Sequence, residues 1–231
     1  MMAAFGVVLT LGFALVAREK RLAPPLSLER APIRSVVASP ALRLVYLGSG
    51  LQLFISGAIT AWLPSWFGRV HDLPLNKAGQ AAAAILLLQA LGMVVFGQLS
   101  DRLALRDGGH RYRLAIMLGL ASSALLGTGF LLAPSPLQLA LIAAGAFAAA
   151  GTTGPVGSIV AQLTHPALLA TAFAMLTLAN NIFGLAPGPW VAGQMADGIG
   201  IGTALALCSL TPLLAAACFW QAKRMPPIAG E

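Results

Sequence analysis

Charged side chains are scarce in this sequence of 231 residues. Asp, Glu, Lys and Arg make up only 9% of it, whereas 58% of the residues are hydrophobic and the mean hydropathy is +0.84. A soluble domain usually carries about a quarter charged residues, so this composition excludes an ordinary soluble protein and indicates an integral membrane protein. The net charge of +7 does not indicate nucleic-acid binding, because the basic residues lie in links between apolar runs and not along one helix face.

Cysteines, histidine clusters and catalytic motifs are also scarce. Cys208 and Cys218 are the two cysteines, and on one helix they would stand about 15 Å apart, too far for a disulfide. His71, His110 and His165 lie in links without metal-ligand spacing. The sequence has no G-x-S-x-G, H-E-x-x-H or phosphate-binding glycine loop. We therefore expect neither an enzyme nor a bound metal or cofactor.

Long apolar runs, in contrast, are abundant. A helix that crosses a bilayer needs about 20 apolar residues. Six runs qualify: about 41–67, 79–99, 113–133, 137–163, 167–193 and 199–221. They predict an all-α integral membrane protein with a six-helix bundle over residues 41–221 and a short tail over 222–231.

A seventh run, Met2–Ala17, is shorter than a full span. It would reach roughly 24 Å against a hydrocarbon core of ~30 Å. No positive charge precedes it, and basic residues follow it at once, which argues against a signal peptide. We interpret 1–17 as a partial transmembrane helix and the proline-containing segment 18–40 as a linker.

The links that carry the basic residues alternate along the chain. Of the fourteen Lys and Arg residues, twelve fall in the links and helix starts on one side of the membrane and two on the other. Positive residues favour the cytoplasmic side. The sequence therefore predicts a multi-pass protein of the cell membrane, with the N-terminus outside and segments 18–40, 100–112 and the C-terminal tail inside.

Uncharged polar residues near the centres of the spans are the candidates for a binding site, because no ionisable residue lies there to form a proton relay. They occur in the first, second, fourth and fifth spans: Gln52, Ser56, Gln89, Thr152, Thr153, Asn180 and Asn181. At about 100° per residue, those of the first span and those of the fifth each form one stripe. Such residues either join helices by hydrogen bonds or line a cavity. Because four spans share the polarity at one depth, we favour a cavity.

Glycine and proline gather in the fourth and fifth spans, in "GTTGPVG" and "GLAPGPWVAG". Small residues let helices approach closely, and proline loosens the backbone where a helix bends. Packing and bending are both open for Gly154, Pro155, Gly184, Pro187, Gly188, Pro189 and Gly193. Trp62, Trp66 and Trp190 suit anchors at the outer membrane interface.

The link after the second span, "GQLSDRLALRDGGHRYR", resembles a signature of the major facilitator superfamily, G-x-L-a-D-R-x-G-R-R. The resemblance rests on Gly97, Asp101, Arg102, Arg106 and Arg111, and it departs at Ala104, where the family has glycine. "AWLPSWFGRVHDL" and "NNIFGLAPGPWVAGQMAD" are most similar to the spinster-like branch and, more loosely, to anion–cation symporters.

The resemblance implies that the chain is the C-terminal half, helices seven to twelve, of a twelve-helix transporter, with Met2–Ala17 as a remnant of helix six. It implies secondary active transport of a small organic or lipid-like solute by alternating access, with a proton or sodium ion as coupling ion. The partners would be the bilayer, the solute and a missing N-terminal six-helix half. In the family the signature loop helps to hold the outward-facing state. An oligomeric passive channel and a non-transporting relic or scaffold remain as alternatives.

The topology can be tested with single cysteines at Ser27, Gly108 and Ala229 in a chain whose native cysteines are replaced. We expect none of the three to react with an impermeant thiol reagent in intact cells, because each segment is assigned to the cytoplasm. A cysteine at Lys77, in an outer link, is the reactive control. Labelling of Gly108→Cys from outside would overturn the topology.

Overall fold

The structure, a computed structural model, describes Gly12, residues 34–104 and residues 109–225. The chain divides into two compact units, Met1–Arg30 and Ala31–Glu231, and all elements below belong to the second unit. The expected partial helix over 1–17 (apart from Gly12), most of the expected linker and the residues after Met225 lie outside the described residues.

Six helical spans long and apolar enough to cross a membrane occur in the described part of the chain, which confirms the six predicted spans. The short helix α2 (Arg34–Ala38) falls within the expected linker and precedes them. The first three spans are α3 (Pro40–Val70), α4 (Leu75–Ala104) and α5 (Gly109–Leu131). The fourth span consists of α6 (Pro136–Gly151) and α7 (Thr153–Gln162). The fifth span consists of η1 (Pro166–Leu168), α8 (Leu169–Asn180), the π-helical turn η2 (Asn181–Leu185) and α9 (Pro187–Ile199). The sixth span consists of α10 (Ile201–Cys208) and α11 (Thr211–Arg224).

Local sequence sets several helix ends. Ser39 and Ser135 each precede a proline at the first helical position, and their hydroxyls accept from the backbone N–H of Leu42 and Gln138 at 3.3 Å and 3.2 Å. Serine at the N-cap followed by proline is a favoured helix start. Gly200 separates α9 from α10 with a φ of 83°, which glycine adopts without strain.

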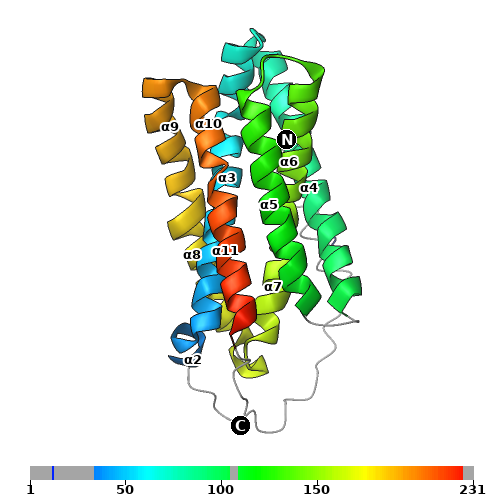
Figure 1. Cartoon of the computed structure of the whole chain (residues 1–231), viewed down its shortest axis with the longest axis vertical. Coiled ribbons are helices and arrows are strands. Elements are labelled where there is room, and N and C mark those ends of the chain that lie inside the picture. The colour runs from blue at the N-terminus through cyan, green and yellow to red at the C-terminus, as the bar shows by residue number, and fades with distance from the viewer. Residues whose placement is uncertain (1–11, 13–33, 105–108, 226–231) are drawn as a thin grey trace. The chain divides into compact units, whose positions relative to one another are not determined.

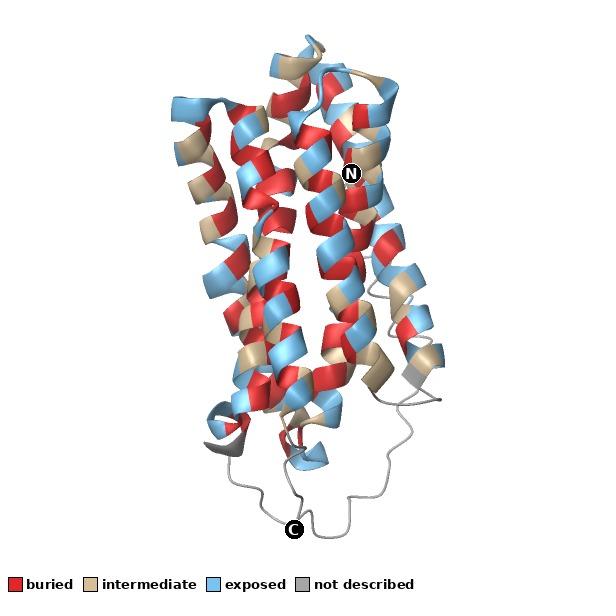
Figure 2. Ribbon diagram, in the orientation of Figure 1, coloured by how far each residue is buried: buried red, intermediate tan, exposed pale blue. Residues whose placement is uncertain are grey.

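Helix α3 occupies the centre of the bundle. It packs against four of the other five spans, namely α4, α6 with α7, α8 to α9, and α10 with α11 (Figure 1). It meets α5 through the side chain of Gln52. Burial follows this arrangement, because 61% of the most apolar window of α3 is buried, against 22% for α4 and 28% for the span of α8 and α9 (Figure 2). Helix α4 and the span of α8 and α9 are therefore the most exposed spans of the bundle.

Glycines permit the closest helix contacts. A Cβ atom on Gly92 of α4 would stand 2.2 Å from the carbonyl oxygen of Phe147, and one on Gly154 would stand 2.6 Å from the Cα of Gly97. A Cβ on Gly184 would stand 2.5 Å from the carbonyl oxygen of Gly50. Backbones approach this closely only where no side chain intervenes, which is how membrane helices associate without a hydrophobic driving force.

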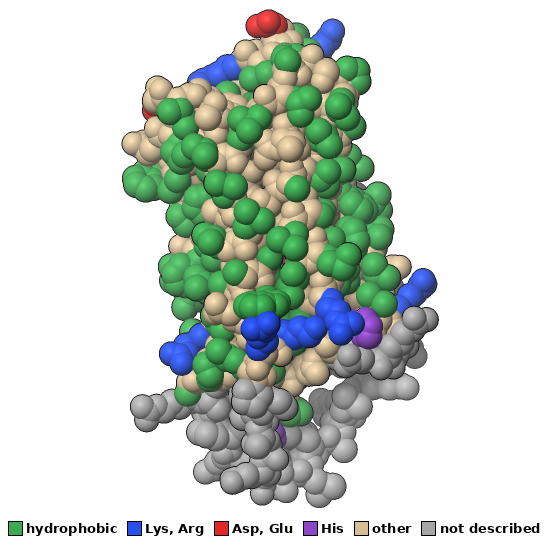
Figure 3. Space-filling model, viewed as in Figure 1, with side chains coloured by type: hydrophobic (Ala, Val, Ile, Leu, Met, Phe, Trp, Pro, Cys, Tyr) green, Lys and Arg blue, Asp and Glu red, His purple; other side chains and the backbone are tan. Residues whose placement is uncertain are grey.

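Charged side chains lie at the two ends of the bundle. One end carries Arg43, Arg102, Arg111, Arg113, Lys223 and Arg224 with Asp101; the other carries Arg69 and Lys77 with Asp72 and Asp197. The face seen in Figure 3 shows hydrophobic and uncharged side chains across its middle and basic side chains near both ends. This distribution fits a protein that spans a bilayer.

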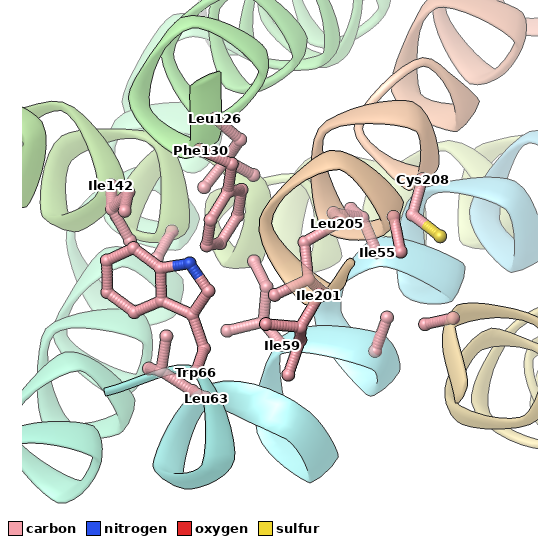
Figure 4. Packing of buried hydrophobic residues seen from close by; sticks show 14 of the residues in the cluster. Ile55, Ile59, Leu63, Trp66, Leu126, Phe130, Ile142, Ile201, Leu205 and Cys208 are labelled. Atoms are coloured by element: carbon pink, nitrogen blue, oxygen red, sulfur yellow. The ribbon is translucent and has the colours of Figure 1, made fainter. Parts of the chain in front are cut away.

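Trp66 lies in the apolar core near the end of the bundle that carries Asp72. It is 0% exposed and packs edge-on against Phe67, Phe130 and His71, with ring centroids 5.0–5.5 Å apart. Figure 4 shows its indole between Ile142 and Phe130. The expectation of an interfacial anchor is wrong for Trp66, because its side of α3 packs against Phe130 of α5 in the apolar core.

Candidate functional site

Gln52 lies in the interior of the bundle, where α3, α5 and α6 meet. Its side chain is 1% exposed, and its Nε2 donates to Ser122 Oγ at 3.3 Å and to the carbonyl oxygen of Ala149 at 3.4 Å. Ser122 in turn donates to the carbonyl oxygen of Gly119 at 3.0 Å. Gln52 therefore links three spans through one amide.

Thr152 joins the same cluster from the break between α6 and α7. Its hydroxyl is buried and donates at 2.9 Å to the carbonyl oxygen of Ala149, which also accepts from Gln52. Thr153 is exposed and donates to the carbonyl oxygen of Ala150 at 3.0 Å. The structure thus brings Gln52 and Thr152 together and directs Thr153 to the surface.

Gln89 and Ser56 are buried, at 8% exposed each. Neither Gln89 Nε2 nor Ser56 Oγ has a hydrogen-bond partner among the described residues. A buried polar group without a partner costs about 1–3 kcal/mol, so these two sites favour an additional polar group, such as water or a ligand. No hydrogen bond among the described residues joins either side chain to Gln52 or Thr152.

Asn180 and Asn181 lie where α8 passes into η2. Asn181 is exposed, and its Nδ2 donates to the carbonyl oxygen of Thr177 at 2.8 Å. Its own carbonyl accepts from the N–H of Ala186 at 3.0 Å, the wider spacing of a π-helical turn. Asn180 is half-buried, and its Oδ1 has no partner among the described residues. Single π-helical turns inside α-helices are frequent at functional sites.

The glycines and prolines of the fourth and fifth spans serve close packing. Besides Gly154 and Gly184, a Cβ on Gly188 would meet the carbonyl oxygen of Phe54 at 2.3 Å, and one on Gly193 would meet the Trp62 ring at 2.6 Å. The Trp62 indole donates to the carbonyl oxygen of Pro189 at 2.7 Å. Pro155 is buried in α7, and Pro187 opens α9 directly after the π-helical turn. Their role in bending stays a prediction.

The signature loop is described in part. Gly97 lies against Gly154, Asp101 and Arg102 are exposed at the end of α4, and Arg106 lies outside the described residues. Arg111 is half-buried, and its Nε has no hydrogen-bond partner among the described residues. The switching role of this loop stays a prediction.

Ser122 is the contact that the sequence did not reveal. The third span contains no Asn or Gln in its interior, so it offered no amide signal. The pair Ser122–Ser123 was the available signal, and both serines are buried. No group of three or more His, Cys, Asp or Glu side chains that could hold a metal occurs in residues 34–104 and 109–225.

The bond between Gln52 and Ser122 can be measured with a double-mutant cycle of Gln52→Leu and Ser122→Ala. We expect a coupling free energy of about 0.6 kcal/mol, and at most about 1.7, the range of hydrogen bonds between membrane helices. The readout is the free energy of unfolding in mixed detergent. Thr128→Ala is the matched control, because the Thr128 hydroxyl donates only within its own helix. A coupling that equals the Gln52–Thr128 value would contradict the assigned bond.

The chain resembles known transporters in sequence and in fold. No protein-family model matches it. It is 29% identical over 199 residues to an MFS-type efflux pump of Mycolicibacterium smegmatis (strain ATCC 700084 / mc(2)155), which covers 81% of this chain and 46% of the relative.

Two solved structures share the fold. Both are of a bacterial homologue of the human lysosomal transporter Spinster in an inward-facing conformation, one unoccupied and one occupied. The TM-scores are 0.73 and 0.70 at 17% and 18% identity, with 96% and 95% of this chain and 57% and 55% of those chains covered. The chain thus spans about half the length of the transporters that it matches. The chain is thus similar in sequence to an MFS-type efflux pump, and its six-helix fold is that of part of a Spinster homologue.

Proposed function

We propose that the chain is one six-helix half of a secondary transporter that moves a small organic or lipid-like solute by alternating access. The observation that carries the proposal is the match of 96% of this chain to 57% of a Spinster homologue at a TM-score of 0.73. Alternating access in such folds is the rocking of one bundle against another around a site near the midplane. The active unit therefore includes a second six-helix bundle, with the basic end of this one in the cytoplasm.

Uneven burial supports a second bundle. Helix α4 exposes Leu87, Leu91 and Val94, at 71%, 51% and 56%. Phe173 and Asn181 are exposed on α8 and η2. The Phe173 ring lies beside α7, because a Cβ on Gly157 would lie 3.6 Å from it. We assign these two faces to the contact with the second bundle and to the wall of the cavity between the bundles.

The transport proposal is tested in membrane vesicles from the cell that makes the protein and from a cell in which its gene is deleted. We expect saturable flux of an organic anion or lipid-like solute, driven by a proton or sodium gradient, to be lost on deletion. The purified chain alone, in sealed liposomes, should show no such uptake above empty liposomes, because one bundle cannot rock against itself.

Each other outcome selects a different function. Saturable, gradient-driven uptake by the chain alone would refute the need for a second bundle. Single-channel conductance would identify an oligomeric channel. If every organic anion and lipid-like solute tested shows equal flux in both vesicle preparations, the protein is a relic or scaffold that does not transport them.

Among the candidate cavity residues, we propose that Asn181 contacts water and solute, because it is exposed beside the π-helical turn. The hydrogen bonds of Gln52 and Thr152 instead connect helices inside the bundle. Gln89, Ser56, Asn180 and Thr153 remain candidates for the lining.

The assignment of Asn181 is tested by substituted-cysteine reactivity in native membranes. Asn181→Cys should react with a water-soluble thiol reagent, because the reactive thiolate forms readily only in contact with water. Ile182→Cys is the matched control: Ile182 is the next residue, is 55% exposed and points to a different side of the helix. We expect at least tenfold faster reaction at position 181. Equally slow reaction at both positions would place both residues in lipid and contradict the assignment of Asn181 to the cavity.

A further inference from the structure

An apolar groove runs along α3 where α8 and η2 lie against it. It has a volume of about 390 Å³. Its lining is Val37, Arg43, Tyr46, Leu47, Met175, Leu178, Ala179, Ile182 and Phe183. Eight of these side chains are apolar or aromatic, and one is charged. The size and the lining are those of a site that takes a ligand with a long apolar part.

The groove continues toward the basic end of the bundle. A second hollow, of about 340 Å³, shares Arg43 and Leu47 with it and extends to Gln221 and Met225 at the end of α11. Arg43 therefore lies where the two hollows meet. It is exposed, and neither hollow is lined by an acidic residue.

The level of Arg43 along the bundle is that of a membrane surface. Arg43 lies in the first turn of α3, and Lys223 and Arg224 lie in the last turn of the neighbouring α11. The guanidinium of Arg224 stacks over the Trp220 ring, 3.5 Å from its centroid, and Trp220 is 46% exposed. Tryptophan and basic residues mark the headgroup level. Figure 3 shows basic side chains in a band across the ends of α11 and α5.

Tyr46 provides a second polar group one turn deeper than Arg43. It lines the groove and is 6% exposed, and its hydroxyl is buried without a hydrogen-bond partner among the described residues. A buried tyrosine hydroxyl usually has a partner, and helix side chains lean toward the helix start, here toward Arg43. A cation at the surface, a hydroxyl one turn below it and an apolar groove beyond match the order of phosphate, glycerol ester and acyl chain.

We propose that this groove binds an anionic phospholipid of the surrounding membrane leaflet. Its phosphate pairs with Arg43, an ester oxygen accepts from the Tyr46 hydroxyl, and one acyl chain lies along Leu47, Leu178 and Ile182. The positive charge selects an anionic headgroup over a zwitterionic one, and the apolar lining holds the chain. The lipid is a bound partner of the bundle, so the proposal does not depend on the transported solute.

The test uses the 231-residue chain in phosphatidylcholine bilayers with a small fraction of photoreactive lipid. The two probes are phosphatidylglycerol and phosphatidylcholine that carry the same diazirine near the end of one acyl chain. After illumination, mass spectrometry measures the probe attached to the peptide containing Met175–Phe183. We expect about fivefold more label from phosphatidylglycerol, the factor that corresponds to about 1 kcal/mol for one basic side chain at an anionic surface.

Variants separate the groove from general surface charge. Arg43→Gln should bring phosphatidylglycerol labelling down to the phosphatidylcholine level, and Arg43→Lys should keep most of the preference. Arg113→Gln is the matched control, because Arg113 is an exposed arginine at the same end, on α5, and lines neither hollow. It should leave the ratio unchanged. Leu178→Trp should fill the groove and lower the label from both probes.

Other outcomes would contradict the lipid proposal. Equal labelling by both probes in the unchanged chain, or an unchanged preference in a folded Arg43→Gln variant, would overturn the proposal. An equal loss in Arg113→Gln would assign the preference to general surface charge. Loss of labelling when millimolar glycerol phosphate is present during illumination would assign the site to a free anion instead of a lipid.

Discussion

The packing of the bundle depends on how closely the other spans can approach α3. In lipid there is no hydrophobic driving force between helices, so association relies on van der Waals contact and on hydrogen bonds. Gly48 and Gly50 let α11 and the α8–η2 span reach the backbone of α3, and Gly57 does the same for Leu185 and Pro189. Between these contacts Gln52 holds α5 and α6. The third, fourth, fifth and sixth spans are thus each held to α3 by a close approach at a glycine or by the Gln52 amide.

This packing also accounts for the helices that are left exposed. Helix α4 packs against α3, α6 and α7, with close approaches to α6 and α7 at Gly92 and Gly97, and the fifth span packs mainly against α3 and α10. Their other sides have no neighbour in the described residues. A bundle with its tight contacts on one side and two weakly covered spans on the other can move as one body against a second bundle. In the proposed alternating access, each half would need that property.

The sequence predicted the six spans because the requirement is simple: every backbone polar group in lipid needs an internal partner, so each apolar run of sufficient length forms a helix. Serine–proline pairs also marked two helix starts. The breaks at Thr152 and at Asn181–Leu185 lie next to Pro155 and Pro187, which lack a backbone N–H, in the two glycine- and proline-containing segments. The close contacts of Gly154 with Gly97 and of Gly184 with Gly50 join distant residues, and no local pattern encodes them. The prediction for Trp66 was wrong because no local pattern indicates that its side of α3 packs against Phe130 of α5.

Gln52 and Asn181 show where prediction of the candidate site reached its limit. Both are amides near the centre of a span, and the sequence placed each on a polar stripe. A stripe defines which residues share a side of a helix, but not which neighbour that side meets. For Gln52 the neighbours are Ser122 and the Ala149 carbonyl, so its amide group is used inside the bundle. The Asn181 amide donates only to its own helix at Thr177 and stays exposed. An exposed amide at midplane depth is costly in lipid and favourable in water, so the same polarity that stabilises the bundle at Gln52 requires an aqueous or polar neighbour at Asn181.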